Sequence, residues 1–160
     1  EFKAKTDQLE KLEEKMLALN PAFKGEDHQV DTYYHVSKGR LKLREGNIEH
    51  ALIYYERADT AEAKKSDIIL YQHTPDAALK KILEKTHGIK VIVDKRRRIY
   101  FIDNVKFHFD HVAGLGTFIE VEAIDTDGSI CKNELQKQCA YYAACFELKK
   151  EDFISYSYSD

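Results

Sequence analysis

The sequence has no tryptophan, one methionine, two prolines and only three cysteines in 160 residues, and it has no long hydrophobic run. A membrane-spanning helix needs about 20 predominantly apolar residues in a row, so the sequence predicts no membrane partner. The formal net charge of −3 gives no general excess of positive charge, and we therefore expect no nucleic-acid partner. No signal peptide is visible either, and the reduced thiols expected below favour a cytoplasmic protein.

The spacing of the cysteines also argues against a zinc site. Cys131, Cys139 and Cys145 form neither a CxxC pair nor a cysteine–histidine spacing typical of zinc sites. All three fall in or beside one expected helix, so we expect buried, reduced thiols with a packing role.

Hydrophobic periodicity indicates a single domain over residues 1–160 with three helices and about eight strands. Helical spacing of apolar residues covers 7–19, 75–87 and 132–148, with Asp7 as the expected N-cap of the first helix. Strand-like alternation covers 1–6, 28–36, 39–46, 51–58, 66–73, 89–102, 105–112 and 117–125. The tail from residue 151 would add an edge strand.

The connections between these strands are mostly tight turns, which favour antiparallel pairing because parallel strands need long crossovers. The expected fold class is therefore α+β, with an eight-stranded antiparallel sheet curled into a barrel and helices packed outside it.

Charged and apolar residues alternate strictly along several of the strands. Arg40, Lys42 and Arg44 share one face of their strand. The same alternation places further charged residues on common faces: Glu1 with Lys3, Lys95 with Arg97, Lys106 with Asp110, and Glu120 with Glu122. One interpretation is the solvated face of an ordinary antiparallel sheet. The other is an inward-facing charged surface, with the helices covering the apolar outer face.

The uniform charge of these positions favours the inward interpretation, and it sets a condition on function. Charges in a protein interior are costly unless they are paired or hold a ligand. Lysine and arginine side chains from several strands match phosphate oxygens. Carboxylates beside them would repel an anion unless a hard cation lies between, and Glu1, Asp110, Glu120 and Glu122 offer the oxygens that Mg²⁺ or Mn²⁺ prefers.

Several stretches resemble a known family. The segment "EFKAK" is similar to the end of the ExExK signature of the CYTH superfamily, the triphosphate tunnel metalloenzymes; the first glutamate of that signature would precede residue 1. The segments "GRLKLREG", "ALIYYERAD" and "DKRRRIYFIDNVKFHFDHVAGLGTFIEVEAID" resemble strands of the branch related to class IV adenylyl cyclases. The resemblance implies a closed eight-stranded tunnel and metal-dependent attack on a triphosphate.

The resemblance, together with the alternation, assigns expected roles to residues of this sequence. Expected catalytic residues are Lys3 and Glu122. Expected phosphate-binding residues are Arg40, Lys42, Arg44, Arg57, Lys95, Arg97 and Lys106. Expected metal ligands are Glu1, Asp110, Glu120 and Glu122. Two positions depart from the family pattern: Tyr55 stands where related triphosphatases often carry a lysine, with Arg57 able to replace the charge, and His108 stands where some relatives carry an acid.

We expect the protein to hydrolyse a triphosphate-bearing small molecule with Mg²⁺ or Mn²⁺, because hydrolysis does not require the site to position a ribose as well. Conversion of ATP to cyclic AMP and pyrophosphate is the first alternative, and polyphosphate or nucleotide binding without catalysis is the second. A homodimer is compatible with the sequence.

Overall fold

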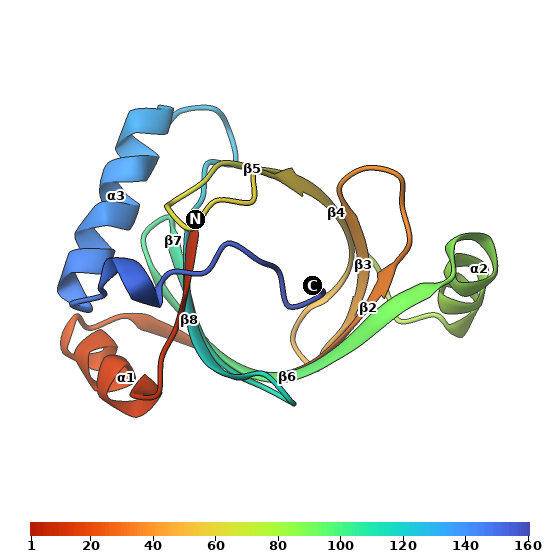
Figure 1. The fold of residues 1–160 in the computed structure, drawn as a ribbon, viewed down its shortest axis with the longest axis horizontal. Coiled ribbons are helices and arrows are strands. Elements are labelled where there is room, and N and C mark those ends of the chain that lie inside the picture. Colours follow the sequence, from red (N-terminus) through yellow and green to blue (C-terminus); the bar gives the residue numbers. More distant parts are fainter.

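A computed structural model describes all residues, 1–160, as one curled sheet with helices on its outer side (Figure 1). The elements in chain order are β1 (Phe2–Lys5), α1 (Leu9–Ala18), β2 (Ala22–Tyr34), β3 (Arg40–Glu45), β4 (His50–Arg57), β5 (Ser66–Gln72), α2 (Ala77–His87), β6 (Ile89–Ile102), β7 (Val105–Val112), β8 (Gly116–Ala123), α3 (Lys132–Cys145) and a short 3₁₀ helix, η1 (Lys150–Asp152). None of the helices has the length and hydrophobicity that crossing a bilayer requires.

The eight strands form a single sheet in the order β1-β8-β7-β6-β2-β3-β4-β5, with every neighbouring pair antiparallel. The predicted eight-stranded antiparallel fold is confirmed, with one difference from a closed barrel. The edge strands β1 and β5 do not pair with each other, so backbone hydrogen bonds do not close the sheet. Residues that flank these two strands join across the seam: Glu1 and Lys64 exchange two backbone hydrogen bonds, at 2.8 and 2.9 Å, and the Glu1 carboxylate accepts hydrogen bonds from Arg57 at 2.7 Å and from the Ser66 hydroxyl at 2.9 Å.

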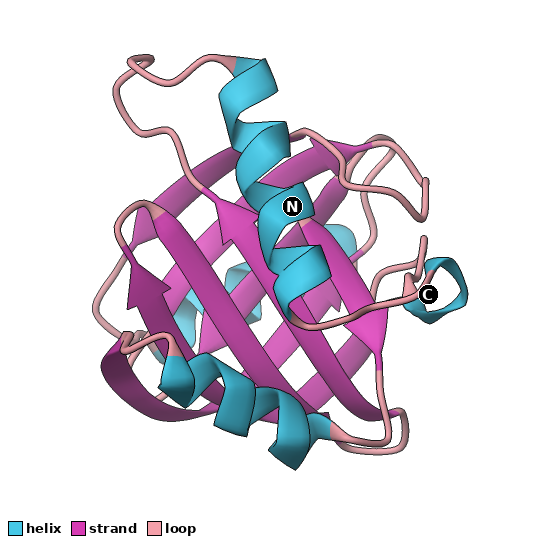
Figure 2. Cartoon of the chain, turned by 90° about the vertical axis from the view of Figure 1, so that its left-hand side faces the viewer, coloured by secondary structure: helices cyan, strands magenta, loops and turns pink.

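The main hydrophobic core lies outside the curled sheet. Apolar side chains from β1, β7 and β8, including Phe107, Phe109 and Val121, pack against Met16 of α1 and Phe146 just after α3. Figure 2 shows α1 and α3 lying across this outer face of the strands. A smaller cluster joins α2 to β2 and β3 on another part of the outer face.

This placement decides between the two interpretations of the alternating strands. Since the apolar residues of β1, β7 and β8 pack outward against α1 and α3, the residues between them point into the lumen. The long strand β6 follows the same rule: Lys95 and Arg97 are buried inside, whereas Arg98 points outward and donates a hydrogen bond to Glu13 of α1. The inward-facing charged surface is therefore the one that the structure contains.

Some local predictions were wrong. Asp7 does not cap the first helix; Gln8 occupies the N-cap position, and the Thr6 hydroxyl accepts its backbone N–H at 3.0 Å. The strand expected over 28–36 begins earlier, at Ala22, and the helix expected over 132–148 ends at Cys145.

The cysteines and the tail also differ from expectation. Of the three thiols only Cys139 is buried, while Cys131, the N-cap residue of α3, is exposed and Cys145 is half-buried. The tail forms no edge strand. It makes a single bridge from Phe153 to Ala4 of β1 and then turns into the lumen, as Figure 1 shows.

A buried aspartate fixes the loop between β3 and β4, which carries a lumen residue. Asp27 of β2 is fully buried and accepts backbone N–H groups of Asn47, Ile48 and Glu49 at 2.7, 2.9 and 3.0 Å. Gly46 allows this close approach, because a Cβ atom there would meet the Asp27 carboxylate at 2.6 Å. The loop geometry follows from a side chain about 20 residues earlier in the chain.

We predict that Asp27→Ala lowers the free energy of unfolding by about 2–3 kcal/mol, because it leaves several backbone donors without an acceptor. Urea denaturation monitored by circular dichroism measures the change. Asp7→Ala is the matched control, since Asp7 is exposed and makes no side-chain cap; we expect it to change stability by less than about 0.5 kcal/mol. Equal midpoints for the two variants would contradict the anchoring role of Asp27.

Candidate active site

The lumen gathers ionic side chains from every strand of the sheet except β2 and β5. Seven basic and four acidic side chains line it: Lys3, Lys42, Arg44, Arg57, Lys95, Arg97 and Lys106, with Glu1, Glu49, Glu120 and Glu122. Ten of these eleven belong to the set expected from the sequence, and Glu49 is the addition. Basic side chains outnumber acidic ones in this lining.

Asp31 holds one group of these cations in place. Its buried carboxylate accepts two hydrogen bonds from the Arg44 guanidinium, both at 2.9 Å, and one from Lys95 at 2.6 Å. Lys42 lies 3.5 Å away. Burial raises the pKa of Asp31, but the three cations outweigh burial and hold it well below its usual value. Asp31 therefore stays charged and fixes a basic cluster on β3 and β6.

Asp110 holds the second group. Arg97 donates to both of its oxygens, at 2.8 and 2.7 Å, and the Tyr158 hydroxyl donates at 2.8 Å. Burial raises the pKa of Asp110, but Arg97 outweighs burial and the pKa falls to about 2. The structure places this expected metal ligand behind Arg97, with both oxygens already bonded and outside the cavity lining.

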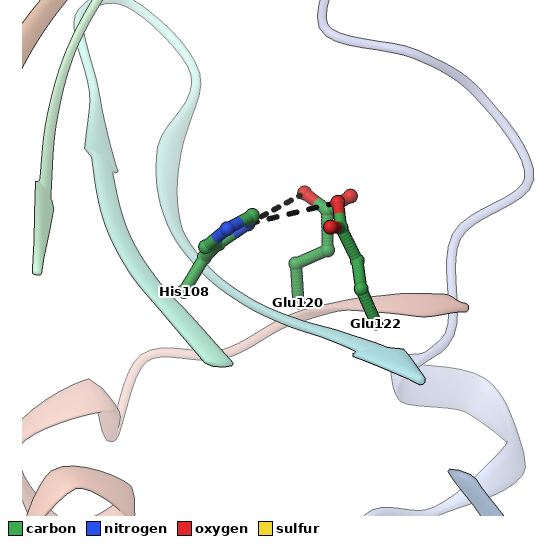
Figure 3. Close-up of side chains that lie close together, drawn as sticks. All are labelled: His108, Glu120 and Glu122. Carbon is green, nitrogen blue, oxygen red and sulfur yellow. Dashed lines mark ion pairs between the residues drawn. The ribbon is translucent and has the colours of Figure 1, made fainter. Parts of the chain in front are cut away.

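Glu120 and Glu122 point into the lumen from β8, and His108 of β7 faces them (Figure 3). His108 Nδ1 lies 3.7 Å from Glu120 Oε2 and 4.0 Å from Glu122 Oε1. Donor atoms of all three residues lie within 4.8 Å of one another. Two carboxylates and an imidazole are a donor set that suits a divalent cation, so the residues present fit a metal ion.

The two glutamates differ in charge state although they are two residues apart. Burial raises the pKa of Glu120, but Lys3 at 3.6 Å, His108 and Arg97 outweigh burial and hold the pKa well below its usual value. For Glu122, burial and the charges of Glu120 and Glu1 act in the same direction and raise the pKa to about 7. At neutral pH, Glu120 is ionised and Glu122 is poised between its two forms.

Sequence reasoning missed Glu49, which lies on the loop that Asp27 fixes. Its carboxylate accepts hydrogen bonds from Lys106 at 2.7 Å and from the Gln29 amide at 2.8 Å, and it lies 3.4 Å from Arg44. The residue falls outside any expected strand, so alternation carried no signal for it.

The C-terminal tail was missed as part of the site. Ser157, Tyr158 and Ser159 are buried, and the Tyr158 ring packs against Phe118 and under the Lys3 ammonium, which lies 3.7 Å from the ring centroid. The tail crosses the lumen in Figure 1, and Ser157 Oγ lies 3.2 Å from the Tyr55 hydroxyl. The tail therefore supplies part of the lumen wall.

Arg40 lies apart from the other predicted phosphate-binding residues. Its guanidinium pairs with Asp59 and Asp160 at 3.1 Å each and is not part of the cavity lining. The Asp160 side chain thus pairs with the Arg40 guanidinium, which the sequence analysis assigned to phosphate binding.

Comparison with known proteins gives a family and several similar structures. The CYTH domain model matches residues 1–151. The PH1012 protein from Pyrococcus horikoshii is 25% identical with a TM-score of 0.84, and the match covers 99% of this chain and 95% of that one. Comparison with curated protein sequences finds no significant match.

Two further structures share the fold at lower identity. A protein from Vibrio parahaemolyticus that carries the provisional name adenylate cyclase is 19% identical with a TM-score of 0.75, covering 98% of this chain and 92% of that one. The S. pombe Pct1 RNA triphosphatase is 14% identical with a TM-score of 0.50, covering 96% of this chain and 71% of that one. At these identities the likeness is one of fold.

The raised pKa of Glu122 predicts how metal-free stability depends on pH. A carboxyl whose pKa is about 7 in the folded protein and about 4.5 when unfolded favours folding at low pH, and this advantage is lost as the pH rises towards 7. With chelator present, we predict that Glu122→Gln raises the free energy of unfolding by about 2 kcal/mol at pH 8 and has little effect near pH 4.5.

Urea denaturation at the two pH values measures this difference. Glu10→Gln is the control, because Glu10 is exposed on α1 and its substitution should leave stability unchanged at both. A Glu122→Gln effect that does not vary with pH would argue against a perturbed carboxyl at this position.

Proposed function

The chain belongs to the CYTH domain family, and from this premise we propose that it is a divalent-metal-dependent phosphohydrolase acting on a triphosphate-bearing substrate held in the lumen. Proteins with this domain are typically triphosphatases or cyclases, they bind triphosphates and they depend on a metal. The observation that carries the proposal is the convergence of seven basic side chains and the Glu120–Glu122 pair on one enclosed lumen.

The basic residues bind the phosphates from fixed positions. Arg44 and Arg97 are each held by a bidentate aspartate, so they keep their orientation before substrate arrives. Lys42 has a side chain only 13% exposed and no carboxylate closer than 3.5 Å, which leaves its ammonium group available to a phosphate oxygen. Donors fixed in advance stabilise developing negative charge without reorganisation.

The acidic side of the lumen supports the chemical step. Glu120 and Glu122 are the residues that would hold a divalent cation, which supplies charge neutralisation on the phosphate oxygens. Lys3 lies between Glu120 and the Tyr158 ring, where its ammonium can donate to an oxygen of the reacting phosphoryl group. Glu49 and Glu1 keep Lys106 and Arg57 aligned along the wall.

The wall formed by β4 and β5 favours an organic triphosphate. Ile53, Ile68 and Leu70 line the lumen there, and Ile68 and Leu70 are half exposed, at 50% and 53%. An apolar surface beside a phosphate site can receive the base or other organic group of a substrate. This patch also supports the second candidate, a class IV adenylyl cyclase, in which the ribose 3′-hydroxyl attacks the α-phosphorus of ATP and pyrophosphate leaves.

Incubation of the protein with ATP, tripolyphosphate or thiamine triphosphate, each with Mg²⁺ or Mn²⁺, distinguishes the candidates. We predict release of inorganic phosphate, with organic triphosphates preferred over tripolyphosphate because of the apolar wall. Cyclic AMP together with pyrophosphate would instead establish the cyclase. Tight binding without any product would replace both with a binding function.

Lys42→Met tests the phosphate-binding wall. A hydrogen bond to a charged group contributes about 1.5–3 kcal/mol, so we predict about a tenfold or greater increase in KM with a smaller change in kcat. Lys38→Met is the matched control, because Lys38 is 77% exposed and pairs with Glu56 on the outer surface. Equal KM values for the two variants would show that Lys42 does not contact the substrate.

A further inference from the structure

His108 is a buried polar side chain whose hydrogen bonds are all missing. It is 1% exposed, and neither Nδ1 nor Nε2 has a hydrogen-bond partner. More than about nine in ten buried polar groups in proteins have a partner. His108 faces the lumen carboxylates with two nitrogens that lack hydrogen-bond partners, and this arrangement needs an explanation.

We propose that His108 is a nitrogen ligand of the cation held by Glu120 and Glu122, and that it shifts the preference of this site from Mg²⁺ towards transition-metal ions that accept an imidazole nitrogen more readily than Mg²⁺ does, such as Mn²⁺ and Co²⁺. The proposal rests on the proposed metal-dependent function and deepens it, because it concerns which metal the lumen selects.

The geometry supports direct ligation. When two donors each bind one ion at about 2.1 Å, they lie about 3–4.3 Å apart. His108 Nδ1 lies 3.7 Å from Glu120 Oε2 and 4.0 Å from Glu122 Oε1, which is within this range. Figure 3 shows the imidazole edge directed at both carboxylates. The distances are too long for hydrogen bonds, so the three groups are spaced for an ion between them.

The neighbouring groups explain why a neutral donor is suited to this position. Arg97 and Lys106 approach from β6 and β7, and the two glutamates from β8, so the region already contains both signs of charge. An imidazole adds a lone pair without adding charge. Affinity of a nitrogen-containing site rises along the first-row transition metals from Mn²⁺ to Co²⁺ and beyond, whereas Mg²⁺ prefers oxygen ligands and keeps its waters.

Pulsed electron paramagnetic resonance of Mn²⁺ bound to the unmodified chain, without any triphosphate, tests the ligation directly. We expect modulation from a directly coordinated ¹⁴N nucleus, and its loss in His108→Asp. Absence of nitrogen modulation in the unmodified protein, or its persistence in His108→Asp, would overturn the proposal. The first measurement needs no variant, so it holds even where a substitution disturbs folding.

Competition between Mn²⁺ and Mg²⁺ tests the selectivity. Even the loss of a group that only orients a ligand changes metal affinity by about 10- to 100-fold, so we expect the ratio of Mn²⁺ to Mg²⁺ affinity to fall at least tenfold when His108→Asp replaces the nitrogen ligand with an oxygen ligand. His111→Asp is the control on the same strand, because His111 is exposed and lies on the opposite face of β7. An unchanged ratio in His108→Asp would refute the selectivity claim.

Neither measurement depends on turnover. Nitrogen coordination without any phosphate release would leave the ligand assignment intact and reject the hydrolase. Phosphate release without nitrogen coordination would support the hydrolase and reject His108 as a ligand.

Discussion

The structure depends on the pairing of two buried aspartates with the basic residues of the lumen. Seven cationic side chains enclosed by one sheet would repel one another strongly in a low-dielectric interior. Asp31 and Asp110 lie beneath them, each with two oxygens bonded to an arginine, and each stays ionised because the cations outweigh the cost of burial. Removing one partner of such a network would leave an uncompensated charge, so the aspartates and the arginines require one another.

A charged lumen in turn requires that the hydrophobic core lie elsewhere. Small barrels usually fill their interior with side chains, but here the main apolar clusters, on β1, β7 and β8 and on β2 and β3, face outward, and α1, α2 and α3 cover them. The helices therefore stabilise the fold and also free the interior for polar groups. The same alternation along β7 places Phe107 in the outer core and Lys106 in the lumen, so folding and ligand binding use opposite faces of the same strands.

Alternation predicted the lumen well because a strand has a strict two-residue period. Lys95 and Arg97 could be assigned to one face from the sequence, although only the structure showed which face, since Arg96 and Arg98 gave an equally charged alternative. Residues outside the strands were not predictable in this way. Glu49 reaches the lumen because Asp27 fixes its loop, and Tyr158 reaches it because the tail leaves β1 and crosses the interior. Both contacts join segments far apart in the chain, and local patterns carry no information about them.

The same limit applies to the Glu120–Glu122 pair, which the sequence presents as two equivalent carboxylates. Their difference comes from their surroundings: Lys3 of β1 and Arg97 of β6 keep Glu120 ionised, whereas burial and the charges of Glu120 and Glu1 raise the pKa of Glu122 to about 7. Two carboxyl groups whose pKa values are pushed apart can play different roles in one reaction. Glu120 is suited to a permanent negative charge, and Glu122 can gain or lose a proton near neutral pH. A two-residue spacing thus places both groups in the lumen, but the curled sheet makes them chemically distinct, because it brings side chains of β1 and β6 close to Glu120.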